Sequence, residues 1–175
     1  MKPSIVAFTG PAGVGKDTAA SFLIARGYKK IAFAQGLKDM LAAIGWPEPA
    51  DRAEKEVPNP DFGGVSYRRA AQTLGTGWGR GLYEDFWTDV MAHKLRQAEA
   101  LVVITDLRFE NEATLVRDMG GQIIHLYGRM AALGAAAAHA SESGIDSAAD
   151  DWHIENTGSM EALRNTVLSR LGFTA

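Results

Sequence analysis

Near the start of the chain, the stretch "FTGPAGVGKDTAA" (residues 8–20) combines residue types that could bind phosphate. Gly10, Gly15 and Lys16 meet the pattern G-x-x-x-x-G-K between an expected strand and an expected helix, the context that marks a phosphate-binding loop. Glycines let the backbone wrap a phosphate, the helix N-terminus presents N–H groups, and the lysine adds a positive charge. The sequence therefore predicts nucleotide binding, with a glycine-rich turn and a solvated lysine as the alternative. The loop residues expected to bind ATP are Gly10, Ala12, Gly13, Val14, Gly15, Lys16, Asp17 and Thr18.

Asp17 departs from the usual pattern of such loops. A hydroxyl residue normally follows the lysine and binds Mg²⁺, whereas here the hydroxyl comes one residue later, at Thr18. The Asp17 carboxylate could bind Mg²⁺ directly or through water, because this ion prefers oxygen ligands and keeps part of its water shell. It could equally be a first-turn acid that interacts favourably with the helix dipole. Both interpretations stay open on the sequence alone.

The run "LVVITD" ends in an acid after four apolar residues, the arrangement of a Walker B strand. Asp106 is therefore expected to lie near Lys16 and hold Mg²⁺ or its waters, with a cap of the following helix as the alternative. Arg108 could reach the phosphates, and its pairing with Glu110 or Glu112 is the rival interpretation. The predicted catalytic residues here are Lys16, Asp106 and Arg108, and the predicted metal ligands are Asp17, Thr18 and Asp106.

Four further stretches, "RRAAQTLGTGWGR", "DLRFENEA", "HASE" and "IENTGSMEAL", follow in that order. Together with the G-K-D-T loop, they make nearly all of the chain resemble the bacteriophage deoxynucleoside monophosphate kinase family. The resemblance implies transfer of the γ-phosphate of ATP to a deoxynucleoside monophosphate, with ATP as co-substrate and Mg²⁺ as cofactor. It also places the acceptor at the first stretch, with Arg69 as the leading phosphate clamp and Gln72 as a base contact. No nucleic acid polymer or membrane is expected as a partner, and whether the chain forms a homodimer stays open.

Arginines are the residues that such a reaction needs most. Transfer to a monophosphate gathers several negative groups, and the attacking phosphate is already mostly ionised at neutral pH, so cations matter more than a base. The planar guanidinium binds phosphate at two points, although any one of these arginines could instead be a surface residue. Trp78 could stack on the base or pack in the core. The expected acceptor-binding residues are Arg68, Arg69, Gln72, Trp78, Arg80, His139 and Glu142.

Arg129 ends an expected strand and begins an alanine-rich segment, where related kinases keep a lid arginine. We expect it to be catalytic and to contact ATP. His139, Ser141 and Glu142 suggest a catalytic triad, but no nucleophile-elbow pattern surrounds the serine. A lid segment that contacts the acceptor or the donor fits these residues better.

The last expected strand is followed by Asn156 and Gly158, where this fold commonly binds adenine through backbone and amide groups. Both are expected to bind ATP. The alternative is a turn at Asn156 and a helix cap at Ser159. His93 and His125 fall in an expected helix and strand and are interpreted as structural.

The composition is that of an ordinary globular domain, with 46% hydrophobic and 22% charged residues among 175. The net charge of −3 argues against a protein that coats nucleic acid. The chain has no cysteine, which excludes disulfides and thiolate catalysis. The first apolar run is too short for a signal peptide, so we expect a cytoplasmic protein, in the host cytoplasm if the source is a phage.

Strand-like and helix-like runs alternate along the chain. Strands are expected at residues 4–10, 28–34, 100–106, 122–128 and 152–156, and helices at 15–25, 37–44, 67–98 with a break at 75–81, 111–119, and from 160 onward. This alternation predicts a mostly parallel sheet covered on both faces, with ligands at the carboxyl ends of the strands. We therefore expect an α/β, three-layer P-loop kinase fold with about five strands. It would form a single domain over residues 1–175, with an acceptor-binding excursion at about 46–82 and a lid at about 129–150.

Two other functions remain as alternatives. One is another small-molecule P-loop kinase, such as a dephospho-coenzyme A or phosphomevalonate kinase, against which the "RRAAQTLGTGWGR" stretch argues. The other is a non-catalytic nucleotide-binding regulator, but the sequence has no guanine-reading N-K-x-D motif.

Overall fold

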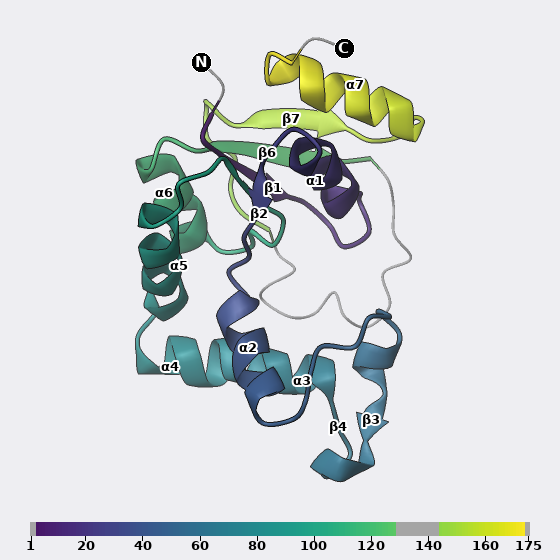
Figure 1. The fold of residues 1–175 in the computed structure, drawn as a ribbon, viewed down its shortest axis with the longest axis vertical. Helices are drawn as coiled ribbons and strands as arrows, with labels where there is room; N and C mark the ends of the chain where they lie inside the picture. The colour runs from purple at the N-terminus through teal and green to yellow at the C-terminus, as the bar shows by residue number, and fades with distance from the viewer. Residues whose placement is uncertain (1–2, 129–143, 174–175) are drawn as a thin grey trace. The chain divides into compact units, whose positions relative to one another are not determined.

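The structure is a computed structural model that describes residues 3–128 and 144–173. The chain divides into two compact units (Figure 1). The sheet unit comprises Met1–Ala32 and Lys94–Ala175, and the helical unit comprises Phe33–His93. The acceptor-binding excursion expected at about 46–82 falls inside the helical unit.

The sheet unit is built on five strands in the order β2-β5-β1-β6-β7, and every neighbouring pair is parallel. The strands are β1 (Ile5–Thr9), β2 (Lys29–Lys30), β5 (Val102–Ile104), β6 (Gln122–Tyr127) and β7 (Trp152–Glu155). The helices of this unit are α1 (Lys16–Ile24), α6 (Glu110–Asp118) and α7 (Met160–Arg170). The parallel sheet of about five strands predicted from the sequence is therefore confirmed.

Alternation of side chains along β1 separates the two apolar faces of the sheet. Val6 and Phe8 belong to a core that includes Leu23 of α1 and Val167 of α7. On the opposite face, Ile5 lies close to α6, because a Cβ atom added to Gly121 would lie within 3.1 Å of side-chain atoms of both Val116 and Ile5. Helices thus cover both faces and produce three layers (Figure 1).

The central strand β1 fixes where a ligand can bind. The chain leaves β1 for β2 on one side of it, whereas β6 pairs with its other edge. The segment after β1 therefore lies at a topological switch point, where the connections run in opposite directions and a crevice opens at the carboxyl ends of the strands. The glycine-rich stretch that begins at Gly10 occupies this position.

β2 is shorter than the strand expected at residues 28–34. It pairs with β5 through Lys29 and Lys30, and the N–H of Ile31 makes one more bond, to the Val103 carbonyl. The next two residues, Ala32 and Phe33, are buried although they lie outside the strand.

The helical unit contains short elements around a small aromatic core. Trp46 stacks on Phe62 with ring centroids 4.1 Å apart, and Tyr67 meets Trp46 edge-on. The elements are α2 (Gln35–Ala43), η1 (Glu54–Glu56), β3 (Pro58–Asn59), η2 (Pro60–Phe62), β4 (Val65–Ser66), α3 (Tyr67–Gln72), η3 (Thr73–Gly79), α4 (Arg80–Leu82) and α5 (Phe86–Arg96), whose last residues belong to the sheet unit.

The helix break expected at residues 75–81 is wrong. α3 continues through the π-helix η3 into α4, and the chain leaves the helix only before α5. The glycines serve packing instead: the Trp87 indole N–H donates to the Gly75 carbonyl at 2.7 Å, and a Cβ atom on Gly79 would lie 2.3 Å from that nitrogen. A widened helical turn of this kind leaves room for the ring, so the glycine cluster marks a contact surface and not a helix end.

Candidate functional site

The loop from Gly10 to Gly15 connects β1 to α1 and needs glycine at both ends. Gly10 and Gly15 have φ angles of +127° and +104°, which L side chains rarely adopt. A Cβ atom on Gly10 would lie 2.1 Å from the Leu126 carbonyl oxygen of β6. One on Gly15 would lie 2.7 Å from the side-chain amide of Asn156. The backbone of the loop is therefore packed closely against the ends of two neighbouring strands.

Asn156, which follows β7, holds this loop from within the sheet unit. It is only 4% exposed, its Nδ2 donates to the Val14 carbonyl at 2.8 Å, and its backbone N–H donates to the Tyr127 carbonyl at 2.8 Å. A buried amide bonded in this way fixes the loop shape. Sequence reasoning missed this role, and the ATP contacts expected of Asn156 and Gly158 stay predictions.

Lys16 lies at the first position of α1 and folds over its own loop. Its Nζ donates to the carbonyl oxygens of Gly10 and Pro11 at 2.6 and 2.8 Å. The ammonium is therefore held at the phosphate loop, where the N-terminus of α1 also presents backbone N–H groups. An incoming phosphate would exchange these neutral carbonyl contacts for charged ones, which are stronger.

Asp17 makes contacts that the loop pattern did not reveal. Its Oδ1 lies 2.6 Å from the ammonium of Lys30 and accepts a hydrogen bond of 3.1 Å from the Thr105 hydroxyl. Partial loss of hydration would raise the pKa of the Asp17 carboxyl, but the Lys30 ammonium and the Thr105 hydroxyl lower it below its usual range. The group is therefore a carboxylate at neutral pH. Lys30 and Thr105 sit at the carboxyl ends of β2 and β5, and that position was the available signal for finding them.

Asp106 follows Thr105 and lies half-buried at the end of β5. The last paired residues of β1 and β5 are Ala7 and Ile104, two residues before Thr9 and Asp106. The Thr9 hydroxyl donates to the Leu107 carbonyl at 3.1 Å, which ties the ends of the two strands together. The predicted position of Asp106 next to the phosphate loop is consistent with this geometry.

The predicted metal ligands offer donors of the kind that Mg²⁺ prefers. The carboxylates of Asp17 and Asp106 and the hydroxyl of Thr18 supply only oxygen donors, which this ion prefers, and it commonly takes one or two carboxylates together with substrate phosphates and water. Within residues 3–128 and 144–173, no three His, Cys, Asp or Glu side chains form a group that could hold a metal by themselves. The donors around the loop fit a magnesium ion that arrives with a nucleotide.

Glu112 fixes the backbone at Arg108. The Glu112 side chain is buried, with 4% of the residue exposed, and its Oε2 accepts the backbone N–H groups of Arg108 and Phe109 at 2.9 and 3.2 Å. This carboxylate caps the start of α6, because it satisfies N–H groups that have no partner within the helix. Glu112 thus contacts the main chain of Arg108, and sequence reasoning missed its role as a cap.

Five of the seven acceptor residues expected from the sequence lie on one helical run, α3 through α4: Arg68, Arg69, Gln72, Trp78 and Arg80. Arg68 forms an ion pair with Glu56, and Arg80 donates to the Glu84 carbonyl at 3.3 Å. Arg69 is exposed on this run. Trp78 is 42% exposed and packs edge-on against Phe86, and Gln72 is half-buried. Arg129, His139 and Glu142 lie outside the described residues, and their roles stay predictions.

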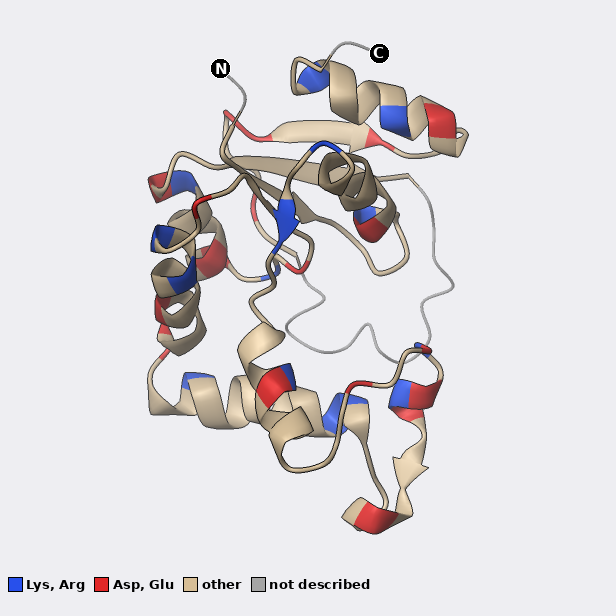
Figure 2. Cartoon of the chain, in the orientation of Figure 1, with Lys and Arg blue, Asp and Glu red and all other residues tan. Residues whose placement is uncertain are grey.

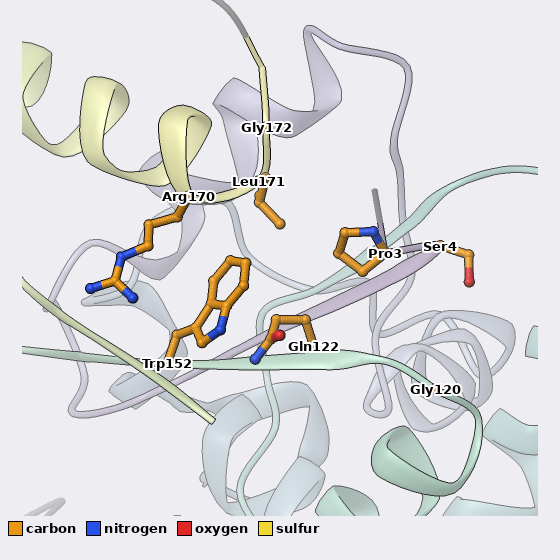
Figure 3. Close-up of a pocket in the computed structure, with 8 residues that line it drawn as sticks. All are labelled: Pro3, Ser4, Gly120, Gln122, Trp152, Arg170, Leu171 and Gly172. Carbon is orange, nitrogen blue, oxygen red and sulfur yellow. The ribbon is translucent and has the colours of Figure 1, made fainter. Parts of the chain in front are cut away.

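A hollow of about 840 Å³ lies at the amino ends of the strands of the sheet unit (Figure 3). It is lined by Pro3, Ser4, Gly120, Gln122, Trp152, Arg170, Leu171 and Gly172. Ligands of parallel sheets bind at the opposite, carboxyl ends, so this hollow is distinct from the nucleotide site predicted at the loop. In the described part of the chain, no helix has the length and apolar character that a membrane span requires.

Comparisons with known proteins show the family to which this chain is similar. Residues 50–167 match the family model "Deoxynucleotide monophosphate kinase". A protein of Acanthamoeba polyphaga mimivirus named "Putative deoxynucleotide monophosphate kinase" is 30% identical over 143 residues, which cover 70% of this chain and 72% of that protein.

Two solved structures are similar in fold. A gluconokinase from Sinorhizobium meliloti 1021 has a TM-score of 0.52 at 13% identity, covering 97% of this chain and 91% of its own. A tunicamycin resistance protein from Deinococcus radiodurans has a TM-score of 0.51 at 14% identity, covering 99% of this chain and 98% of its own. At such identities the likeness shows the fold alone, and with the observed sheet it confirms the predicted three-layer P-loop kinase architecture.

Proposed function

The chain belongs to the deoxynucleotide monophosphate kinase family, and we propose that it transfers the γ-phosphoryl group of ATP to a deoxynucleoside monophosphate. The observation that carries the proposal is the glycine loop at the end of β1, where Lys16 is held over the loop carbonyls. In a chain of this family, such a loop suits the phosphates of a nucleoside triphosphate.

On the donor side, the loop N–H groups and Lys16 would bind the β- and γ-phosphates. Asp17, Thr18 and Asp106 would hold Mg²⁺, which neutralises charge on the phosphates when it is bound. Asn156 keeps the loop in shape through its bond to the Val14 carbonyl. The chain itself would thus supply hydrogen-bond donors, held in fixed positions, around the phosphoryl group that is transferred.

On the acceptor side, Arg69 is the leading candidate for binding the monophosphate. It is exposed on α3, and its neighbour Arg68 is already paired with Glu56. Gln72 and Trp78 follow on the same helical run and would contact the base. A catalytic base is not required, because the second pKa of a phosphate monoester is about 6 and the attacking oxygen is ionised at neutral pH.

The proposal is tested by a coupled assay of ADP release, in which the purified protein receives ATP, Mg²⁺ and each deoxy- and ribonucleoside monophosphate in turn. We expect turnover that depends on at least one deoxynucleoside monophosphate. Dephospho-coenzyme A and phosphomevalonate serve as comparison acceptors. Turnover with either of them alone, or ATP binding without transfer to any acceptor, would contradict the proposal.

A further inference from the structure

Three elements of the sheet unit bring charged and polar groups together at Asp17. This residue lies in the first turn of α1, Lys30 ends β2, and Thr105 follows β5. The ammonium of Lys30 and the hydroxyl of Thr105 both contact the same oxygen, Oδ1 of Asp17, at 2.6 and 3.1 Å. Both residues of β2 are lysines, and its ribbon is blue throughout in Figure 2. Only Lys30 forms this ion pair.

Stability of the fold does not explain this ion pair. The side chains of Asp17 and Lys30 are 78% and 45% exposed. Ion pairs this accessible to water contribute about 0–1 kcal/mol to stability. The same exposure leaves both groups within reach of ligands and ions from solution.

Because the Asp17–Lys30 ion pair lies beside the phosphate loop, we expect it to affect phosphate binding and not stability. Asp17 directly follows Lys16 in the first turn of α1, next to the loop that we propose binds the phosphates of a nucleotide. A carboxylate near phosphate repels it unless a cation compensates the charge. In this structure the compensating cation is the Lys30 ammonium, and Thr105 supplies a further hydrogen bond to the same oxygen.

We propose that Lys30 is a positioning residue of the nucleotide site: it neutralises Asp17 when no metal is present and competes with Mg²⁺ for that carboxylate. This inference rests on the proposed function only in taking ATP as the ligand. Lys30 thereby lets phosphate enter the loop without repulsion from Asp17. It also sets the concentration of Mg²⁺ at which the metal replaces it.

The test measures ATP binding by calorimetry, first in EDTA and then across a magnesium titration, without any acceptor. We expect Lys30→Met to weaken metal-free ATP binding about tenfold, because the uncompensated carboxylate then faces the phosphates, and a tenfold change corresponds to about 1.4 kcal/mol. At saturating Mg²⁺ the loss should shrink to less than about twofold, because the metal then compensates the same charge. In Lys30→Met, the Mg²⁺ concentration at which ATP affinity has risen halfway to its saturating value should be lower than in the parent.

Matched variants separate charge from packing. Lys29→Met changes the neighbouring lysine, whose side chain points to the opposite face of the strand, and should behave as the parent. Lys30→Arg keeps the positive charge and should bind ATP without metal about as tightly as the parent does. In an Asp17→Asn background, Lys30→Met should have little further effect, since the carboxylate that needs a partner is gone.

The outcomes also separate this inference from the proposed function. If the parent protein does not bind ATP, the proposed function fails. If the parent binds ATP but Lys30→Met binds it with parental affinity in EDTA, or loses affinity equally with and without Mg²⁺, the role of Lys30 is overturned and the proposed function stands.

Discussion

At the scale of single residues, Arg69 offers the clearest test of the acceptor side. Arg69→Ala removes a guanidinium that would bind the acceptor phosphate at two points, and a charge-assisted contact of this kind is worth about 1.5–3 kcal/mol. We expect kcat/KM for the monophosphate to fall roughly a hundredfold, with little change in the Kd for ATP measured alone.

The control for that experiment is Arg164→Ala, which removes an arginine from the exposed side of α7. It should leave both constants unchanged. If Arg69→Ala weakened ATP binding as much as it lowered kcat/KM for the monophosphate, this arginine would lie outside the acceptor pocket.

Some site residues belong to a local sequence pattern, whereas others meet only because their strands are neighbours in the sheet. The positions of Lys16 and Asp106 were predictable because each stands at a fixed distance from a strand end within a local pattern, and their roles stay predictions. Lys30 and Thr105 contact Asp17 only because β2 and β5 are neighbours in the sheet. Strand order is not written in any local pattern, so the position of Lys30 and Thr105 at strand ends was a signal for the residues but not for their contact with Asp17.

At the scale of elements, the strands and helices of the sheet unit were largely predictable because their apolar runs are bounded by glycines and caps. β1, β6 and α7 fall where their patterns indicate. The glycine cluster in η3 was misinterpreted, because glycine both ends helices and makes room for a neighbouring ring. Only the packing of Trp87 distinguishes these uses.

A pair of glycine substitutions tests that packing. Gly79→Ala would place a Cβ atom 2.3 Å from the Trp87 indole nitrogen, so we expect a loss of about 1–3 kcal/mol in unfolding free energy. A Cβ atom on Gly81 has no neighbour within 4 Å, and Gly81→Ala should be neutral or stabilising by up to about 1 kcal/mol. Urea unfolding measures both. Similar values for the two variants would contradict the packing role of Gly79.

The segment that precedes β7 is held by Asp151, and this contact predicts a pH dependence. The Asp151 carboxylate accepts from Arg117 at 2.7 Å and from the Ala148 N–H at 2.9 Å, and it lies 3.0 Å from His125. Burial would raise the pKa of Asp151, but Arg117 and the Ala148 N–H lower it below the ordinary value of 3.8. Since the folded pKa is the lower one, this group stabilises the fold above pH 3.8 and loses its contribution as the pH falls through the folded value.

Asp151→Asn should therefore cost about 2 kcal/mol near neutral pH. The difference from the parent should narrow below pH 3.8, measured by urea unfolding across a pH series. Asp150→Asn, at an exposed neighbouring position, is the control and should differ little from the parent at any pH. If the difference in unfolding free energy between Asp151→Asn and the parent stayed constant with pH, the stabilising role of the Asp151 carboxylate would be contradicted.

At the scale of the whole molecule, the family model and the geometry of the phosphate loop concern different parts of the chain. The family model begins at residue 50, after the phosphate loop, and includes the arginines of α3 and the strand end at Asp106. The loop itself is recognised from its glycine geometry and from Lys16. The phosphate loop and the match to the family model are therefore separate observations.

Binding of ATP should raise the thermal stability of the whole protein, and we expect most of this increase to depend on Lys16. A ligand that binds only the folded state stabilises it by about 2.7 kcal/mol at a hundred times its Kd, so ATP with Mg²⁺ should raise the Tm of the parent by several degrees. The bonds from the Lys16 Nζ to the Gly10 and Pro11 carbonyls stay within the loop, which Asn156 also holds. Lys16→Ala should therefore keep the parental Tm without ligand and lose most of the ATP-induced increase. A folded Lys16→Ala protein with the full increase would show that the phosphates bind elsewhere.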